Sequence, residues 1–319
     1  MRTGIRLAIL ISVGALILAS SLLFQATPPM KLGTNLWPGY EPLYVGREIG
    51  VLQENEVALV ELLSASEVMR AFRNGAIDAA ALTLDEVINL RVMGLEPVIV
   101  QVTNFSMGAD VILARPGIVT LNDLRGKRVG VEATALGAYM LSRALEIHEM
   151  ELADIKVVHL EVNEHVQAFQ EGKVDALVTF DPVPQQIGPD QAVRLFDSSV
   201  IPGEIVDVLV VRKSVLEKRH KQVRYLINAW HQALAFIETQ PARSARLMAS
   251  RLKLPPADVE QSLGGLRLPG HQESIELFSG DVAPLQKQAE RLADIMRANH
   301  LIDEVPDLNG LVYRRYPES

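Results

Sequence analysis

The first pattern along the chain is an alternation of short apolar runs with segments whose apolar residues recur at helical spacing. It extends from about residue 31 to residue 211. Beyond that, only helical spacing remains, divided by proline and glycine into four or five helices. Alternating strands and helices are typical of α/β folds with parallel sheets and right-handed crossovers. The apolar runs predict strands at 31–36, 57–63, 77–82, 97–102, 110–114, 128–131, 156–162, 174–178 and 204–211.

Within this pattern one peptide occurs twice, at residues 66–79 and 163–176, with matching Glu, Ala, Phe, Gly, Asp and Ala. Each copy predicts a helix with a polar N-cap, a glycine just past its end and a strand beyond. A strand–helix–strand unit built twice predicts two similar lobes with a ligand-binding cleft between them. Inside the copies we expect structural roles for Phe72, Phe169, Gly75, Gly172, Asp78 and Asp175.

The candidate site is the set of loops at the carboxyl ends of the strands, where open α/β sheets bind their ligands. Five such loops are predicted, and four of them lead directly into a helix with free backbone N–H groups. Aromatic rings there can stack on a ring or surround an ammonium, and side-chain oxygens can accept hydrogen bonds. The candidate ligand-binding residues are Trp37, Tyr40, Ser66, Thr83, Asp85, Phe105, Glu132, Thr134, Phe180 and Asp181.

Several of these candidates also have a purely structural interpretation. Asp181 precedes a proline, as an ordinary N-cap residue does, and Asp85 is an acid in the first turn of a predicted helix. Either serine of residues 64–66 can cap the helix that follows. Trp37 can close the end of a lobe, and Tyr40 can pack on the next helix. The sequence leaves these alternatives open.

Composition narrows the class of function. The chain has 319 residues, enough for one large or two medium α/β domains, and its net charge of −8 gives no indication of a nucleic-acid surface. It has no cysteine, which excludes disulfides, thiolate metal sites, cysteine nucleophiles and a lipoprotein anchor. No metal-ligand spacing of histidines, nucleophile elbow or phosphate-binding glycine loop occurs. We therefore expect a binding protein without cofactor or metal, and not an enzyme.

The first 26 residues have the pattern of a targeting segment. Arg2 and Arg6 precede an apolar run over residues 7–24, which is about as long as a bilayer span. Cleavage after Ser21 would make it a signal peptide, and retention would make it a membrane anchor. In either case the positive end stays cytoplasmic and the body is exported. Removing residues 1–26 takes away two arginines and no acid, so the body carries −10.

Several motifs together resemble a known family. They are the aromatic loop at 37–43, both Ala-Phe-x-x-Gly-x-x-Asp-Ala copies, the Leu-Asn-Asp-Leu-Arg-Gly-Lys-Arg-Val-Gly segment at 121–130, and Phe-Asp-Pro at 180–182. The chain resembles the periplasmic solute-binding proteins of ABC importers, in the nitrate/sulfonate/bicarbonate (taurine-type) and thiamine-pyrimidine-precursor group.

The resemblance implies a type II periplasmic-binding-protein fold, with two doubly wound lobes joined by two crossover strands and with C-terminal helices. Lobe 1 would comprise residues 27–112 plus 207–319, and lobe 2 residues 113–206. The implied function is the extracytoplasmic substrate-binding component of an ABC importer, which captures a small organic solute by lobe closure. It implies a monomer in the periplasm that delivers its ligand to a permease in the inner membrane.

One departure from the family pattern bears on the ligand. Many sulfonate binders place Gly-Ser at the helix start where this chain has Glu-Ala-Thr-Ala at 132–135, and a carboxylate there disfavours an anion. The five loops contain no Lys or Arg. These charges favour a neutral or cationic ligand.

If the N-terminal anchor is retained, the alternative is a membrane-tethered sensor that reports ligand to a kinase or cyclase.

Overall fold

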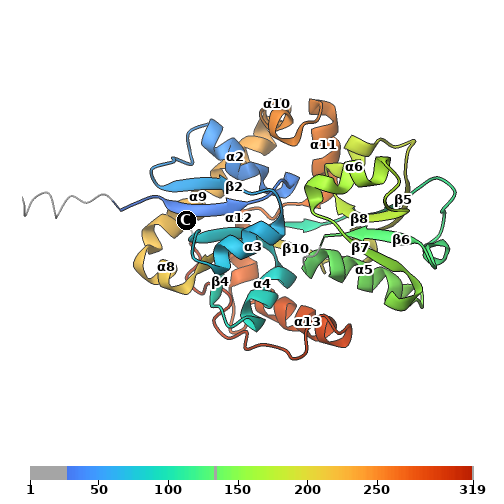
Figure 1. Ribbon diagram of the computed structural model, residues 1–319. Coiled ribbons are helices and arrows are strands. Elements are labelled where there is room, and N and C mark those ends of the chain that lie inside the picture. Colours follow the sequence, from blue (N-terminus) through green and yellow to red (C-terminus); the bar gives the residue numbers. More distant parts are fainter. Residues whose placement is uncertain (1–26, 133–134, 318–319) are drawn as a thin grey trace, which may run out of the picture.

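The computed structural model describes residues 27–132 and 135–317, which form two mixed sheets flanked by helices (Figure 1). One sheet has six strands in the order β11-β4-β10-β3-β1-β2, and the other has five in the order β7-β6-β8-β5-β9. The strands are β1 (Met30–Thr34), β2 (Val57–Glu61), β3 (Ala79–Thr83), β4 (Pro97–Ser106), β5 (Asp110–Ala114), β6 (Arg128–Val131), β7 (Lys156–His159), β8 (Ala176–Phe180), β9 (Val193–Asp197), β10 (Val206–Arg212) and β11 (Leu266–Arg267).

Helices cover both sheets and make up most of the described residues after β10 (Figure 1). Short 3-10 turns occur at Pro38–Tyr40, Leu121–Leu124, Leu152–Asp154, Val162–Glu164 and Ser198–Val200. The α-helices are α2 (Glu41–Glu48), α3 (Ala65–Arg73), α4 (Leu84–Val92), α5 (Ala135–Ile147), α6 (His165–Gln170), α7 (Val183–Ile187), α8 (Lys213–Lys218), α9 (His220–Thr239), α10 (Pro241–Leu252), α11 (Pro256–Gly264), α12 (His271–Phe278) and α13 (Pro284–Ala298).

The strand predictions agree with the structure within a few residues, with three exceptions. β4 runs on to Ser106, because it pairs along its whole length with β10. β9 was missed because its burial is irregular and shows no clean alternation. The prediction of helices alone after residue 213 was wrong at β11, a two-residue strand that forms only because the edge of β4 is available.

The duplicated peptide forms the same unit in each sheet, which confirms the structural roles predicted for it. Helices α3 and α6 bury Phe72 and Phe169, and Gly75 and Gly172 follow with φ of +75° and +73°. The carboxylate of Asp78 accepts a hydrogen bond from Lys31 N at 3.0 Å. The carboxylate of Asp175 accepts the equivalent bond from Arg128 N at 2.9 Å. Each aspartate ties the start of its strand to the neighbouring strand.

The chain passes between the two sheets through residues 107–109 and 198–205. These segments are joined where Gly108 N donates to Ser198 Oγ at 2.7 Å. The C-terminal region returns to the same place, since Met107 N donates to Gly265 O at 2.8 Å. A Cβ on Gly265 would lie 3.1 Å from Ala109 N, so this approach suits glycine. The late helices are therefore fastened to the junction of the sheets.

The predicted targeting segment, residues 1–26, lies outside the described residues. Within 27–132 and 135–317, no helix combines the length and the apolar character that crossing a bilayer requires.

Candidate ligand-binding site

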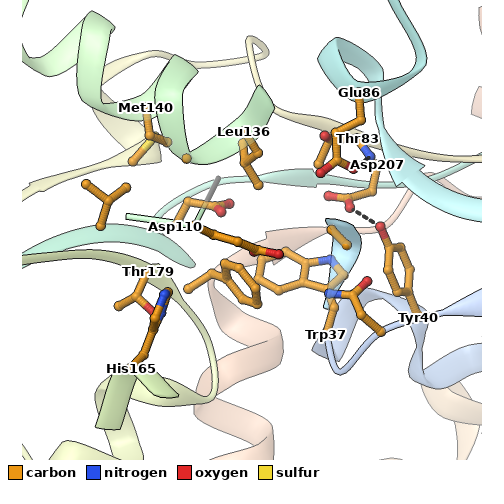
Figure 2. Close-up of a pocket in the computed structure, with 16 residues that line it drawn as sticks. Trp37, Tyr40, Thr83, Glu86, Asp110, Leu136, Met140, His165, Thr179 and Asp207 are labelled. Carbon is orange, nitrogen blue, oxygen red and sulfur yellow. Dashed lines mark hydrogen bonds between the residues drawn. The ribbon is translucent and has the colours of Figure 1, made fainter. Parts of the chain in front are cut away.

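A cavity lies where the carboxyl ends of strands from both sheets face each other (Figure 2). It contains about 530 Å³ of space free of atoms, including its opening. Contributions come from β3 and β10 of one sheet, from β5 and β8 of the other and from the start of α5, so both sheets form its wall. The residues that line it are Asn35, Trp37, Tyr40, Ala65, Thr83, Glu86, Asp110, Glu132, Leu136, Gly137, Met140, His165, Val178, Thr179, Phe180 and Asp207.

Aromatic rings form one side of the cavity. Trp37 follows β1 and Phe180 ends β8, and their rings meet edge to face with centroids 5.5 Å apart. Both side chains are buried. An indole face beside a benzene ring is an arrangement that receives flat or cationic groups.

A hydrogen-bonded chain fixes the Trp37 indole. Asn104 lies between Trp37 and Asp207. Oriented to satisfy both neighbours, its amide oxygen accepts from Trp37 Nε1 at 3.2 Å and its nitrogen donates to Asp207 Oδ2 at 3.0 Å. Tyr40 OH donates to Asp207 Oδ1 at 2.6 Å. Gly39 makes room for this chain, because a Cβ there would lie 2.4 Å from Trp37 Nε1. The indole is therefore positioned before any ligand arrives.

Four carboxyl groups line the cavity, and three of them are shown converging above the Trp37 indole in Figure 2: Glu86, Asp110 and Asp207. The fourth is Glu132, whose Oε1 is 3.5 Å from Ser66 N across the cleft. One oxygen of Glu86 and one of Asp110 have no partner among the described residues. None of the described residues that line the cavity is a Lys or an Arg. The wall thus offers unpaired hydrogen-bond acceptors and carboxyl groups without a cationic partner.

Burial raises the pKa of each of these acids, because a carboxylate away from water loses its hydration. The pKa values of Asp110 and Glu132 both rise to about 7, with desolvation as the first cause. The pKa values of Glu86 and Asp207 rise well above the ordinary range for the same reason. Neighbouring acids add to the shift, since Asp85 acts on Glu86 and Asp110 acts on Asp207. A positive or hydrogen-donating guest would relieve this cost.

His165 faces the cavity from the second copy of the repeat (Figure 2). Its Nδ1 lies 2.9 Å from Thr179 Oγ1, and its Nε2 has no partner among the described residues. Burial lowers the pKa of the imidazole to about 4, so the ring is neutral near pH 7. A neutral imidazole supplies one donor and one acceptor and adds no positive charge to the wall.

The structure brings half of the predicted site residues to the cavity: Trp37, Tyr40, Thr83, Glu132 and Phe180. Ser66 lies just behind, with its N–H toward Glu132. Ser64, not Ser66, caps α3, accepting from Glu67 N at 3.3 Å. Thr134 lies outside the described residues.

Three predicted residues do not reach the cavity wall: Asp85, Phe105 and Asp181. Asp85 is buried at the first turn of α4, and burial raises its pKa to about 6. The Phe105 ring lies under the Arg267 guanidinium, 4.0 Å from ring centroid to Cζ. Asp181 is buried with a pKa raised to about 6, and it does not cap α7, whose N-cap is Pro182.

The residues that sequence reasoning missed fall into two groups. Glu86 was visible as the acid of a capping box, and it does accept from Thr83 N at 3.0 Å, but its second oxygen is free. Asn35 and Thr179 lie beside or within the predicted loops, whereas His165 lies in the second copy of the duplicated peptide, at the start of α6. Asp110 and Asp207 instead lie at the starts of strands that run antiparallel to their neighbours. Where a strand runs antiparallel to its neighbours, its start lies beside their carboxyl ends. These two acids can therefore be assigned to the site only once the strand directions are known.

Arg251 supports the binding loop from behind, although it is far away in the sequence. Its guanidinium donates to Asn35 O at 3.0 Å and lies over the Tyr44 ring, 3.7 Å from the centroid. It also pairs with Glu61 at 3.1 Å and with the buried Glu41. Helix α10 therefore holds the loop that carries Trp37.

Comparison with known proteins is consistent with this geometry. The NMT1-like family model matches residues 25–253, more than half of the chain. The chain belongs to the NMT1-like family. A protein of Escherichia coli (strain K12) named as an aliphatic sulfonates-binding protein is 25% identical over 263 residues, covering 82% of this chain and 80% of that one.

Solved structures share the fold of this NMT1-like protein. The alkanesulfonate-binding protein SsuA of Xanthomonas axonopodis pv. citri bound to MOPS has a TM-score of 0.75 at 20% identity, covering 90% of this chain and 99% of that one. The desulfurization enzyme DSZB has a TM-score of 0.63 at 16% identity, covering 90% and 97%. The periplasmic-binding-protein fold and the solute-binding family predicted from the sequence are therefore confirmed.

Within the described residues, no group of three or more His, Cys, Asp or Glu side chains is arranged to hold a metal ion.

Proposed function

We propose that this NMT1-like protein is the extracytoplasmic solute-binding component of an ABC importer and that its ligand is a small nitrogenous cation or a neutral hydrogen-bond donor. The observation that carries the ligand class is the wall of four buried carboxyl groups with no Lys or Arg in the described lining. An anion placed there would find no described Lys or Arg to compensate its charge, and ionising any of the four acids beside it would bring two like charges together in a medium of low polarity, which costs several kcal/mol.

A cationic guest would reverse that balance. An ammonium or amidinium group can donate to the free oxygens of Glu86 and Asp110 and lie against the Trp37 ring. The sulfonate named for the relatives would instead face Glu132, at the helix start where oxyanion sites need bare N–H groups. We therefore separate this chain from its sulfonate-binding relatives by ligand charge.

Closure of the two lobes around the ligand would let a permease distinguish the loaded protein from the empty one. We take lobe 1 as the part with the six-stranded sheet and lobe 2 as the part with the five-stranded sheet. The chain crosses between them at residues 107–109 and 198–205, a few residues before the boundaries of 112/113 and 206/207 predicted from the sequence. The ligand contacts Trp37 and Glu86 on the first and Glu132 and His165 on the second. A ligand stabilises the closed state only through contacts that exist in that state, and contacts to both lobes meet this condition. The closed protein then docks on a permease in the inner membrane.

The test compares matched probes. Propylamine and propane-1-sulfonate share their carbon chain and differ in the sign of the charged group, and nitrate serves as a small anion. We expect propylamine to raise the melting temperature of the purified body in proportion to the logarithm of its concentration, and the two anions to leave it unchanged. Tight calorimetric binding of propane-1-sulfonate or nitrate would refute the ligand class and leave the solute-binding role intact.

The proposal also covers catalysis, oligomeric state and location in the cell. Lobe closure without covalent chemistry needs no catalytic residue, so the protein is a binder and not an enzyme, and a single chain suffices as a monomer. The sensor alternative is favoured by one observation, the long apolar run at residues 7–24. N-terminal sequencing of the native protein separates the two: an intact N-terminus indicates a tethered sensor, and cleavage near Ser21 indicates free delivery in the periplasm.

A further inference from the structure

A second hollow adjoins the ligand cavity. It is lined by residues of both sheets' loops, among them Leu62, Leu63, Val162, Val166, Phe180 and Lys253, and we name it the outer groove. Phe180 lines both spaces, so the two adjoin at this residue. Leu63 is 64% exposed, a high value for a leucine that faces a cleft.

The two spaces differ in charge. The cavity is lined by four carboxyl groups and no described cation. The outer groove is lined by Arg251, Lys253 and a single acid, Glu61. Arg251 is engaged with Glu41 and Glu61, which leaves its charge compensated. Lys253 is exposed, and no ion pair is formed by it among the described residues. The outer groove therefore combines an uncompensated cation with a largely apolar lining.

The outer groove is built for a chain-like group. Aliphatic residues line it on both sides, with Leu62 and Leu63 from the first sheet's loop, Val162 from the 3-10 turn before α6 and Val166 from α6 itself. Asn163 and Gln186 add polar groups. The groove adjoins the aromatic side of the cavity at Phe180, whose ring meets that of Trp37. Removing methylene groups from water along such a path is favourable, at roughly 0.8 kcal/mol for each fully buried CH₂.

We propose that the outer groove is a second subsite for the same ligand, which has a cationic head, an apolar spacer and an anionic or polar tail. The inference rests on the proposed function, because the head occupies the acidic cavity. The opposite charges at the two ends fix the orientation: the ammonium points inward to Asp110 and the tail points outward to Lys253. The ligand class is an ω-amino acid or a similar elongated zwitterion.

The experiment uses two probe series of equal chain length, n-alkylamines and ω-aminocarboxylates with three to eight carbons, titrated by calorimetry into the protein body. At three carbons the carboxylate still lies within the acidic cavity, and we expect the amine to bind more tightly. At the length that spans Phe180, we expect the order to reverse in favour of the amino acid by about two- to fivefold, the range for an exposed ion pair.

Two pairs of variants locate the effect. Lys253→Ala should remove the advantage of the long amino acid and leave the amines unchanged, whereas Lys221→Ala, an exposed lysine on α9, should change neither. Leu63→Ser should reduce the affinity gained per methylene, and Val119→Ser should not, because Val119 is equally exposed (67%) and lines neither space. All four positions are exposed, so folding is not at risk.

The outcomes distinguish the proposal of an outer subsite from the proposal that the cavity binds a cation. If amines bind and no chain length favours the amino acid, or if Lys253→Ala leaves the preference in place, the outer subsite is refuted and the cationic cavity stands. If short amines fail to bind at all, the cavity's ligand class is refuted and the outer subsite falls with it.

Discussion

The rings of Trp37 and Phe180 meet edge to face at 5.5 Å with their planes at 86°, although one residue follows a strand of the six-stranded sheet and the other ends a strand of the five-stranded sheet. Their contact bridges the cleft. Edge-to-face pairs contribute about 0.5–1.5 kcal/mol beyond the area they bury. Closure of the cleft therefore rests in part on one aromatic pair that also borders the ligand.

Replacing one ring should favour the open state. For Phe180→Leu we expect a larger radius of gyration in solution scattering without ligand, and affinity for propylamine lower by about two- to tenfold. The control is Phe169→Leu, which alters the buried helix–sheet packing of the repeat and does not touch the cavity. It should lower the melting temperature and leave affinity unchanged. Equal affinity losses in both variants would contradict the role of the pair in closure.

The raised pKa values of the cavity acids make both binding and stability depend on pH. Asp110 and Glu132, with pKa values near 7, bind protons in the folded protein that the unfolded chain has already lost above pH 5. The ligand-free protein is therefore expected to lose stability as pH rises from 6 to 8. A cation prefers the ionised acids, so affinity for propylamine should rise over the same interval.

Melting temperatures and calorimetric titrations at pH 6, 7 and 8 check both slopes. The Asp110→Asn variant should flatten each of them, because its amide does not titrate. Near the acid end of this interval, His165 and His231, both with pKa values lowered to about 4, act in the opposite direction and reduce the slope, because the unfolded chain binds the protons that these buried rings do not. A ligand-free protein whose stability rises from pH 6 to pH 8 would show that the acids are not held as described.

Gly39→Ala should damage the site with little effect on the rest of the fold. The added Cβ would lie 2.4 Å from Trp37 Nε1 and closer still to the Asn104 amide, so the indole must move. We expect affinity for propylamine to fall by at least about tenfold, in line with a displaced aromatic anchor. Gly46→Ala in helix α2 is the control, since its Cβ would make only ordinary contacts, the nearest at 3.4 Å, and alanine favours a helix. Wild-type affinity for Gly39→Ala would contradict the importance of the indole position.

Arg251→Met should destabilise the protein strongly. It leaves Glu41 buried without its partner, and breaking a buried pair in this way costs about 3–5 kcal/mol. Burial already raises the pKa of Glu41 to about 7, and without the guanidinium it would rise further. The loss should therefore grow with pH. Urea unfolding at pH 6 and pH 8 measures it.

Adding Glu41→Gln to Arg251→Met should recover part of that loss, because the second change removes the stranded charge. A double variant no more stable than Arg251→Met would mean that packing of the Arg251 stem on Tyr44 is what matters.

Much of the fold could be predicted from the sequence because its signals are local. Apolar runs bounded by turn residues gave strands such as β5 and β6, and the duplicated peptide gave two units with the same glycine and aspartate ties. Loops that follow parallel strands gave Trp37, Thr83, Glu132 and Phe180 at the cavity. Each of these inferences needs only a residue and its neighbours in the chain.

Tertiary structure alone decided the character of the site. Asp110 and Asp207 are separated by nearly a hundred residues and reach the cavity because β5 and β10 run antiparallel to their neighbours, which puts strand starts beside strand ends. Arg251 supports the binding loop because α10 returns to it. The sequence determined that acids and aromatic residues were present. Folding determined which acids were buried together without a cation, since desolvation and mutual repulsion depend on distance in space and not on distance along the chain.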